Sequence, residues 1–172
     1  MKKGFTLLEL MIVLGLISSL LLAVSPVWQT QGREQMLMKE QQKLMVFLRQ
    51  LQARAKNSPH IWFLIANRHP LQDRWCLTAQ IKSAQLCDCF APEHCPTSLA
   101  AQFYYPHFPQ HVKLSSKRYL PFEITRFSGV RDTLSTACFS LFSEQEKVVF
   151  TLFNVGSMKV KRNQSWSACE DE

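Results

Sequence analysis

The most constraining feature of the chain is a single carboxylate near its start. Glu9 lies within an apolar stretch that runs from Phe5 to Val27, directly after the basic residues Lys2 and Lys3. At about 1.5 Å per residue this stretch makes a helix of about 34 Å, which is long enough to span a bilayer. A charged side chain near the middle of a membrane helix costs about 2.5 to 3.5 kcal/mol. Glu9 therefore predicts a partner group, and we expect another copy to supply it.

The residues at the start of this stretch resemble the type IV prepilin signature, with a basic leader, Gly4, Phe5 and a glutamate, Glu9, at the fifth position after the glycine. The resemblance implies that a prepilin peptidase cuts between Gly4 and Phe5 on the cytoplasmic side, and that the new amine of Phe5 is methylated. It also implies that Glu9 pairs with the Phe5 amine of a neighbouring subunit in a filament. This pairing is physically reasonable, because an ammonium and a carboxylate in a dry environment are tolerable only as a hydrogen-bonded pair.

Simpler interpretations compete with this one. A secretory signal would use the basic leader and the small-x-small triplet Ala23–Ser25, but Pro26 follows this triplet directly and the apolar stretch is longer than a usual signal core. A plain signal anchor explains the length and the leader, which the positive-inside rule places in the cytoplasm. It gives no reason for Glu9 or for the Gly4-Phe5 pair, and these favour the prepilin interpretation over an anchor or a chance match.

Length and composition predict one soluble domain after the helix. The chain has 172 residues, of which 47% are hydrophobic and 19% charged, and a formal net charge of +7. Cleavage after Gly4 removes two lysines, which leaves 18 basic and 13 acidic residues and a net charge of +5. We expect a leader at residues 1–4, a transmembrane and filament-core helix at 5–27, an amphipathic helix at 28–57 that continues into the domain, and a β-rich domain at 58–172.

The segment Gln29 to Lys56 predicts an amphipathic helix that packs on a sheet. Apolar residues recur along it at helical spacing, Met45 and Phe47 widen their face, and Asn57-Ser58-Pro59 ends the helix. We expect it to continue the apolar stretch as one helix, with Pro26 and Gly32 as places for a bend. The apolar face comprises Leu37, Leu44, Leu48, Leu51 and Ala55, whereas Arg33, Glu40, Arg49 and Lys56 fall largely off it.

Beyond Pro59 the sequence predicts short antiparallel strands and, with the helix, an α+β fold. Apolar and aromatic runs alternate with turn residues, which is typical of strands. The Cys- and Pro-rich middle, from Ser83 to Pro109, predicts loops. The expected strands are 61–66 and 74–79 as a hairpin, 111–115 and 122–127 around the middle, and 136–142, 147–153 and 157–161 as a meander.

Within the pilin-like class, the chain resembles the GspH/FimT branch of minor pilins and minor pseudopilins. The resemblance rests on the stretch Phe47 to Ala55 before an aromatic strand, on Phe127-Ser128-Gly129, and on a last hairpin around Gly156. It implies a long N-terminal helix packed against a β domain of two small sheets, and a role in starting or capping a filament. The family often has an arginine after the final glycine, whereas Ser157 follows Gly156 here.

The six cysteines predict a disulfide framework. All lie in the part that a lysine-flanked anchor places outside the cytoplasm, where thiols are oxidised. A tetrahedral zinc site is the alternative, but its spacing is not a standard one and thiolates compete poorly with oxidation outside the cell. We therefore expect no metal ion and no cofactor. The expected pairs are Cys76 with Cys87, Cys89 with Cys95, and Cys138 with Cys169, and the alternative zinc ligands are Cys87, Cys89, His94 and Cys95.

Two basic clusters raise the alternative of nucleic-acid binding, since such residues could neutralise phosphates and stack on bases. Some minor pilins that resemble this branch bind DNA through basic residues near the C-terminus, which favours the second cluster. A simpler interpretation places its lysines on the solvent face of a strand, with Met158 and Val160 inward and the acidic tail Glu170–Glu172 offsetting the charge. The first cluster comprises Lys113, Lys117, Arg118, Arg126 and Arg131, with Tyr119 nearby, and the second comprises Lys159, Lys161 and Arg162, with Trp166 nearby.

The sequence therefore predicts a structural subunit and not an enzyme, since it contains no Gly-x-Ser-x-Gly, Walker or His-Glu-x-x-His motif. We expect a minor type IV pilin that a prepilin peptidase processes, that an inner-membrane assembly platform takes up, and that joins major and minor pilins at a filament tip. Before assembly it would span the inner membrane once, with its N-terminus in the cytoplasm and its β domain in the periplasm. A DNA receptor on a competence pilus and a pseudopilin of type II secretion are the alternatives.

Overall fold

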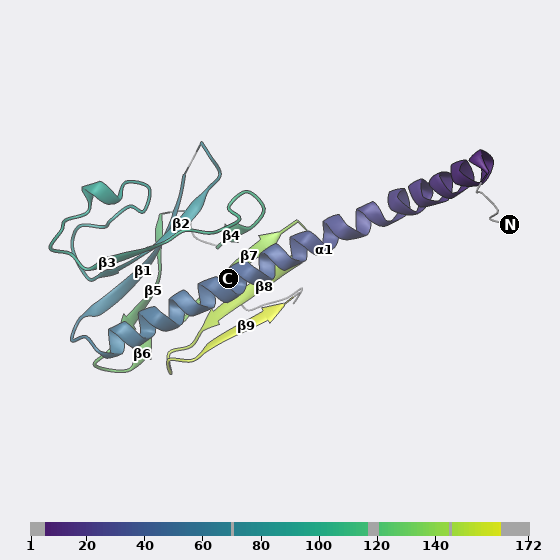
Figure 1. The fold of residues 1–172 in the computed structure, drawn as a ribbon. Coiled ribbons are helices and arrows are strands. Elements are labelled where there is room, and N and C mark those ends of the chain that lie inside the picture. Colours follow the sequence, from purple (N-terminus) through teal and green to yellow (C-terminus); the bar gives the residue numbers. More distant parts are fainter. Residues whose placement is uncertain (1–5, 70, 117–120, 145, 163–172) are drawn as a thin grey trace. The chain divides into compact units, whose positions relative to one another are not determined.

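A single helix dominates the N-terminal part of the chain. The computed structural model describes residues 6–69, 71–116, 121–144 and 146–162, and for residues 22–31 it describes the backbone alone. It divides into two compact units, Met1–Gln35 and Met36–Glu172. Helix α1 (Leu7–Lys56) belongs to both, and it is continuous through Pro26 and Gly32 (Figure 1). Its end at Lys56 confirms the end that the sequence predicted.

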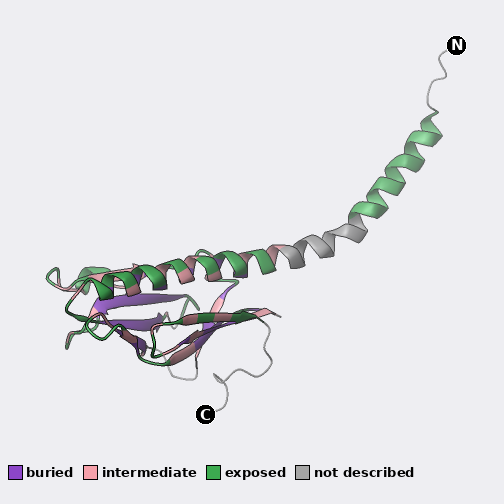
Figure 2. Cartoon of the chain, turned by 90° about the horizontal axis from the view of Figure 1, so that it is seen from below, coloured by how far each residue is buried: buried purple, intermediate pink, exposed green. Residues whose placement is uncertain are grey.

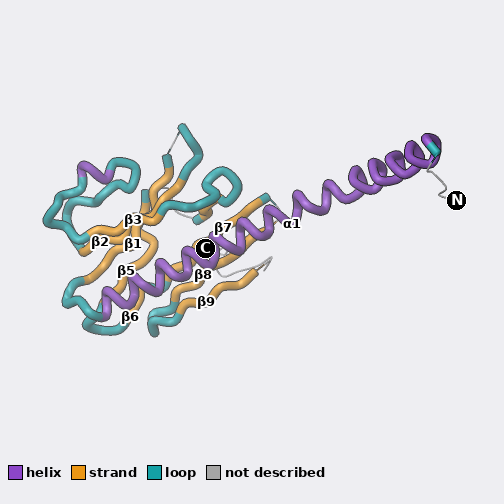
Figure 3. Tube along the Cα trace, in the orientation of Figure 1, coloured by secondary structure: helices purple, strands orange, loops and turns teal. Residues whose placement is uncertain are grey.

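The strands form two antiparallel sheets, which confirms the predicted α+β fold (Figure 3). The five-stranded sheet has the order β3-β2-β1-β5-β6, and the four-stranded sheet has the order β4-β7-β8-β9. The predicted hairpin is the β1–β2 pair, and the predicted meander is β7–β8–β9. The bounds are β1 Ile61–Arg68, β2 Trp75–Ile81, β3 Ala101–Tyr104, β4 Lys113–Ser115, β5 Phe122–Ser128, β6 Thr133–Leu134, β7 Ala137–Ser143, β8 Glu146–Leu152 and β9 Met158–Arg162.

Two short strands and a short helix were not predicted. Strand β3 lies in the segment that predicted loops, as does the 3-10 helix η1 (Pro92–His94), and β6 has only two residues. Strand β3 pairs with β2 from Leu77↔Tyr104 to Gln80↔Ala101, and three of its four residues are half-buried. A strand of this kind shows no clean alternation of apolar and polar residues, because its longer partner determines its position.

The second unit has one core between the sheets and the C-terminal part of α1. Figure 2 shows this part of α1 over buried strands. The five apolar residues predicted on its inner face, from Leu37 to Ala55, are at most 2% exposed, which confirms the predicted stripe. Gly129 permits the closest approach, because a Cβ atom at this position would lie 1.7 Å from the carbonyl oxygen of Ala55. The last turn of α1 therefore requires a glycine at the end of β5.

The disulfides differ from the predicted pairs. Cys76 bonds Cys89 and Cys87 bonds Cys95, with Cα–Cα distances of 6.2 and 5.0 Å, so the predicted pairs Cys76–Cys87 and Cys89–Cys95 are wrong. The chain runs back along β2 after leaving it. Gln80 accepts the Cys87 backbone N–H at 2.7 Å, and Asn67, the β1 partner of Cys76, donates to Asp88 at 3.0 Å. The returning chain thus passes Gln80 first and brings Cys89 to Cys76.

These bonds also bear on the zinc alternative. The sulfur atoms of three of its four ligands, Cys87, Cys89 and Cys95, are used in disulfides, and His94 is exposed. Thiolates for a tetrahedral zinc site are therefore absent from this part of the fold. Cys138 is also disulfide-bonded. Its predicted partner, Cys169, lies outside the described residues, and that pairing stays a prediction.

Candidate functional site

The N-terminal end of α1 carries the predicted assembly residue. Thr6 precedes the helix, and its hydroxyl oxygen accepts the backbone N–H of Glu9 at 3.3 Å, which is the contact of a helix N-cap. Glu9 lies in the first turn, where a carboxylate opposes the positive end of the helix dipole, and it is exposed. The predicted cleavage and methylation residues, Gly4 and Phe5, lie outside the described residues.

The helical surface that follows Glu9 is apolar and uncovered. Its large apolar side chains, from Leu7 to Leu21, are between 47% and 80% exposed, and Figure 2 shows this segment as exposed throughout. Soluble monomers rarely leave a contiguous apolar surface of this kind open, so it marks a site of association with lipid or protein. Glu9 is the one acidic residue in this segment.

Among the described side chains, the helix lacks a stretch that is both long and apolar enough to cross a membrane. The predicted span from Phe5 to Val27 includes Phe5 and the side chains of residues 22–27, which lie outside the described ones. The span stays a prediction.

A second glutamate of α1, Glu40, lies in the core, which corrects the expectation that it falls off the apolar face. It is 0% exposed. Its carboxylate accepts hydrogen bonds from the Tyr104 hydroxyl and from the backbone N–H groups of His107 and Phe108, the latter two at 2.8 and 3.3 Å. Glu40 thereby ties α1 to β3 and to the segment that follows it. Its acceptor atoms are satisfied within the chain, as a buried charge requires.

The neighbours of Glu40 strengthen this contact. Burial, together with the hydrogen bond to Glu40, raises the pKa of Tyr104 well above its usual range, so this hydroxyl stays protonated and donates. The Lys43 ammonium lies 5.0 Å from the Tyr104 ring centre and donates to the Tyr105 carbonyl oxygen at 2.5 Å. The network joins secondary structure elements, and it leaves no carboxylate open to a substrate.

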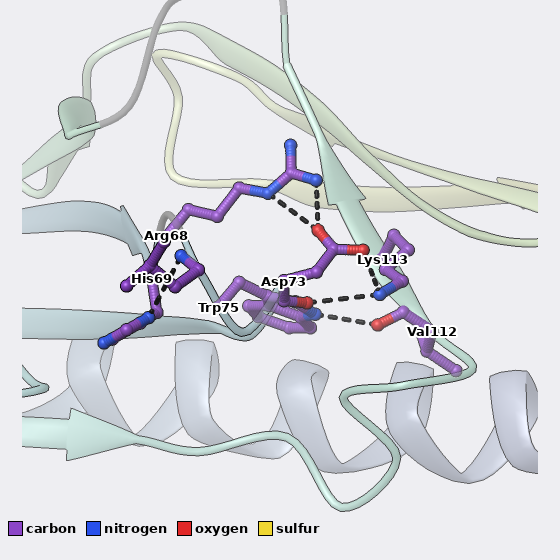
Figure 4. Close-up of polar contacts among 7 residues, drawn as sticks. Arg68, His69, Asp73, Trp75, Val112 and Lys113 are labelled. Atoms are coloured by element: carbon purple, nitrogen blue, oxygen red, sulfur yellow. Dashed lines mark hydrogen bonds and ion pairs between the residues drawn. The ribbon is translucent and has the colours of Figure 1, made fainter.

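A second polar network holds the β1–β2 turn against β4 (Figure 4). Asp73, in the left-handed region at φ 47°, accepts from Arg68 Nε at 3.0 Å and forms an ion pair with Lys113, whose ammonium also donates to the Asp73 carbonyl oxygen at 3.1 Å. The hydrogen bonds from Lys113 and then from Arg68 lower the pKa of Asp73. The Trp75 indole N–H donates to the Val112 carbonyl oxygen at 2.8 Å. These contacts connect the two sheets.

Two members of the predicted first basic cluster are ion-paired within the chain. Lys113 is paired with Asp73, and Arg126 is paired with Glu123 on its own strand. Arg131 is exposed in the turn between β5 and β6. Lys117, Arg118 and Tyr119 lie outside the described residues.

The second cluster lies on β9, an edge strand of the four-stranded sheet. Lys159, Lys161 and Arg162 are exposed, while Met158 and Val160 pack against the core, as the simpler interpretation expected. The Lys159 ammonium lies 5.5 Å from the Phe153 ring centre. The strand thus presents Lys159 and Lys161 on its outer face, with Arg162 exposed at its end. Trp166 and the acidic tail Glu170–Glu172 lie outside the described residues.

Glu40 and Asp73 are the polar residues that sequence reasoning missed. Glu40 stands three residues after Leu37 and four before Leu44, so its spacing did place it on the apolar face, and only its charge argued against burial. Asp73 gave no sequence signal, because its partner Lys113 is 40 residues away and reaches it only when β4 lies beside the β1–β2 turn.

Known proteins show two similarities to this chain. Residues 1–25 match the family described as Prokaryotic N-terminal methylation motif. Over 169 residues the chain is 50% identical to an uncharacterized protein of Haemophilus influenzae, and the alignment covers 98% of this chain and 99% of that protein. No solved structure matches the chain.

Proposed function

Because this chain belongs to the type IV pilin-like prepilins that carry the N-terminal methylation motif, we propose that it is a minor pilin, a non-enzymatic subunit that initiates or caps a filament. In this proposal a prepilin peptidase cleaves the chain after Gly4, and the amine of Phe5 is methylated. The inner membrane holds the subunit by residues 5–27 until an assembly platform adds it to major and minor pilins. Its β domain then passes from the periplasm to the cell surface.

One observation carries the proposal: an exposed carboxylate in the first turn of a helix whose apolar side chains are also exposed. Glu9 and the apolar residues from Leu7 to Leu21 are uncovered in the isolated chain. Packing these helices together buries the apolar surface, and the burial in turn requires a cation for Glu9. The amine of Phe5 on a neighbouring subunit has the required charge, and it is created only by cleavage after Gly4.

Mass spectrometry of the protein extracted from membranes tests the processing. The expected mass corresponds to a chain that begins at Phe5, carries one methyl group and has all six cysteines oxidised. A matched sample from cells that lack prepilin peptidase should retain residues 1–4. A chain that keeps Met1 in wild-type cells, or one that begins at Pro26 as a secretory signal would leave it, contradicts the proposal.

A DNA-binding minor pilin is the second candidate, because β9 carries three exposed basic residues, Lys159 and Lys161 on one face and Arg162 at its end. A gel-shift titration of the full chain in detergent, at several salt concentrations, tests it. If these residues contact phosphates of duplex DNA, changing all three to Ala lowers the slope of log affinity against log salt by about 2 to 3. The triple variant Lys39→Ala, Arg49→Ala and Lys82→Ala removes the same charge elsewhere and should keep the slope. Equal slopes for both variants would exclude β9 as the binding strand.

A further inference from the structure

An open groove lies beside β5 and β6, near the C-terminal end of α1. Its volume is about 620 Å³, within the range of about 300 to 1000 Å³ that is usual for ligand sites. Side chains from the start of β1, from β5 and from the segment between β5 and β7 line it. The pilin proposal does not use this groove. Arg126 and Arg131, which line it, belong to the first basic cluster, but the DNA candidate on β9 does not use them.

Two guanidinium groups give the groove its charge. Arg126 pairs with Glu123 through Nε and Nη2, and it lies 5.1 Å from the Phe63 ring centre. These contacts use Nε and Nη2, and Nη1 has no hydrogen-bond partner among the described residues. Arg131 is exposed, and in the described part of the chain its guanidinium has no hydrogen-bond or ion-pair partner. A planar guanidinium binds a carboxylate through two parallel hydrogen bonds.

The polar wall of the groove is held by two hydrogen bonds and carries hydroxyl groups that can bind a ligand. The Ser135 backbone N–H donates to the Arg126 carbonyl oxygen at 2.9 Å, and the Thr125 hydroxyl donates to the Ser135 carbonyl oxygen at 2.6 Å. These bonds hold the segment after β6 against β5. Hydroxyl groups that line the groove belong to Ser128, Thr133, Ser135 and Thr136, and none of them is bonded within the described part of the chain.

The remaining wall of the groove is apolar, and this favours an anionic ligand that also has an apolar group. Ile61 and Val130 line the groove and are 37% and 78% exposed. Two carboxylates also lie close by, that of Glu123 on Arg126 and that of Asp132, next to Arg131 in the chain and paired with Lys56 at 2.8 Å. A polyphosphate backbone would meet these carboxylates and leave the apolar wall unused. A peptide with an isolated carboxylate and an apolar neighbour matches both walls.

We propose that this groove binds an extended acidic peptide segment of a partner protein. A carboxylate of the segment binds Arg131 and the Nη1 of Arg126, the hydroxyl groups donate to its oxygens and to peptide carbonyls, and an adjacent apolar side chain packs on Ile61 and Val130. The inference goes beyond the pilin proposal, because binding is measured on the purified chain whether or not it enters a filament.

The test uses the full chain, purified in detergent, on an array of hexapeptides that carry one or two acidic residues beside an apolar one. A second array replaces each Asp and Glu by Asn and Gln, and a single-stranded oligonucleotide and inorganic phosphate serve as competitors. We expect enrichment of acidic peptides with an apolar neighbour. Solution affinity for the best peptide should fall at least tenfold in Arg131→Ala and in Val130→Glu.

Two controls separate the groove from general charge and from misfolding. Arg49→Ala removes an exposed arginine of α1 and should keep the affinity, and Arg131→Ala should keep the wild-type melting temperature because its side chain is exposed. Equal binding of the amide array, unchanged affinity in Arg131→Ala, or no acidic peptide bound would each overturn the proposal. An oligonucleotide that binds more tightly than every peptide, and that depends on Arg131, would overturn it in favour of a phosphate site.

Discussion

Glu9 and Glu40 lie on the same helix, and the two carboxylates have opposite surroundings. Glu40 is fully buried and accepts three hydrogen bonds, from Tyr104 and from the backbone of residues 107 and 108. Glu9 is exposed, and its backbone N–H donates to the Thr6 hydroxyl oxygen. A buried charge must be paired or hydrogen-bonded. The fold meets this requirement for Glu40, whereas for Glu9 the pilin proposal assigns it to the Phe5 amine of a neighbouring subunit.

The apolar residues of the two segments differ in the same way. Leu44 and Leu48 are 0% exposed against the sheets, while Leu14 and Leu20 are 55% and 66% exposed. Burying one such side chain contributes about 1.5 to 3 kcal/mol. The C-terminal part of α1 gains this energy when the chain folds, and the N-terminal part gains it only on association. In the pilin proposal, one helix therefore serves folding at one end and assembly at the other.

The largest expected effect concerns Glu9. Glu9→Ala should lower incorporation into filaments at least tenfold, because the amine of a neighbouring Phe5 would be buried without its counter-ion. The melting temperature of the domain should not change. Quantitative immunoblotting of sheared filaments against total protein measures the first effect, and Glu34→Gln, which removes a carboxylate from the same helix, is the control. If Glu9→Ala entered filaments as efficiently as the wild type, Glu9 would not need a partner from a neighbouring subunit, and this contrast with Glu40 would be wrong.

A leucine pair sharpens the comparison. Leu48→Ala should lower the free energy of unfolding by about 2 to 5 kcal/mol, because it leaves a cavity in a core with no exposed surface at that position. Leu14→Ala should change it by less than about 0.5 kcal/mol, because Leu14 is uncovered in the isolated chain. Urea unfolding of the detergent-solubilised chain, followed by tryptophan fluorescence, gives both values. Comparable losses in the two variants would mean that the N-terminal segment also contributes to the stability of the fold.

Removal of the buried carboxylate should have a somewhat smaller effect. Glu40→Ala leaves the Tyr104 hydroxyl and two backbone N–H groups without their acceptor, and we expect a loss of about 2 to 3 kcal/mol in the free energy of unfolding. Glu40→Gln keeps one side-chain oxygen as acceptor and should lose less. The same urea titration measures both. A Glu40→Ala variant as stable as the wild type would show that the network does not support the fold.

The sequence predicted the parts of this fold that depend on periodicity. The stripe from Leu37 to Ala55 and the meander of β7, β8 and β9 follow directly from residue spacing, and both are confirmed. The N-terminal signature from Gly4 to Glu9 is local and matches the methylation motif. Residues 117–120, which include Lys117 and Arg118 of the first basic cluster, and residues 163–172, which include Trp166, lie outside the described residues.

The parts that failed depend on contacts between distant residues. The pairs Cys76–Cys89 and Cys87–Cys95 require the chain to run back along β2, which no spacing rule states. The burial of Glu40 was visible in its spacing, but it required donors from residues 104–108, more than 60 positions away. The groove at Arg126 and Arg131 likewise depends on how the segment after β6 folds onto β5. In each case the sequence indicated the chemistry of the side chain but not the residue that the side chain contacts.

The smallest expected effect is a pH dependence at Asp73, which contrasts an exposed ion pair with the buried Glu40. Lys113 and Arg68 lower the pKa of Asp73, so its contacts add stability above the unfolded pKa of about 3.9. This contribution is lost as the pH falls through the lower folded value. The urea midpoint of the wild type should therefore exceed that of Asp73→Asn at pH 6, and the difference should shrink below about pH 4.

Asp132→Asn is the matched control for this pH dependence, because Asp132 is also ion-paired and also has φ 47°, a conformation that asparagine tolerates. It reports the combined cost of losing one exposed ion pair and of placing asparagine in a left-handed turn, for an aspartate that does not contact β4. A difference between wild type and Asp73→Asn that is the same at pH 6 and at pH 2 would show that Asp73 acts through its backbone conformation and not through its charge. The exposed carboxylate would then play no electrostatic part in holding β4 to the β1–β2 turn, and that contact would rest on the bonds from Trp75 to the Val112 carbonyl and from Lys113 to the Asp73 carbonyl.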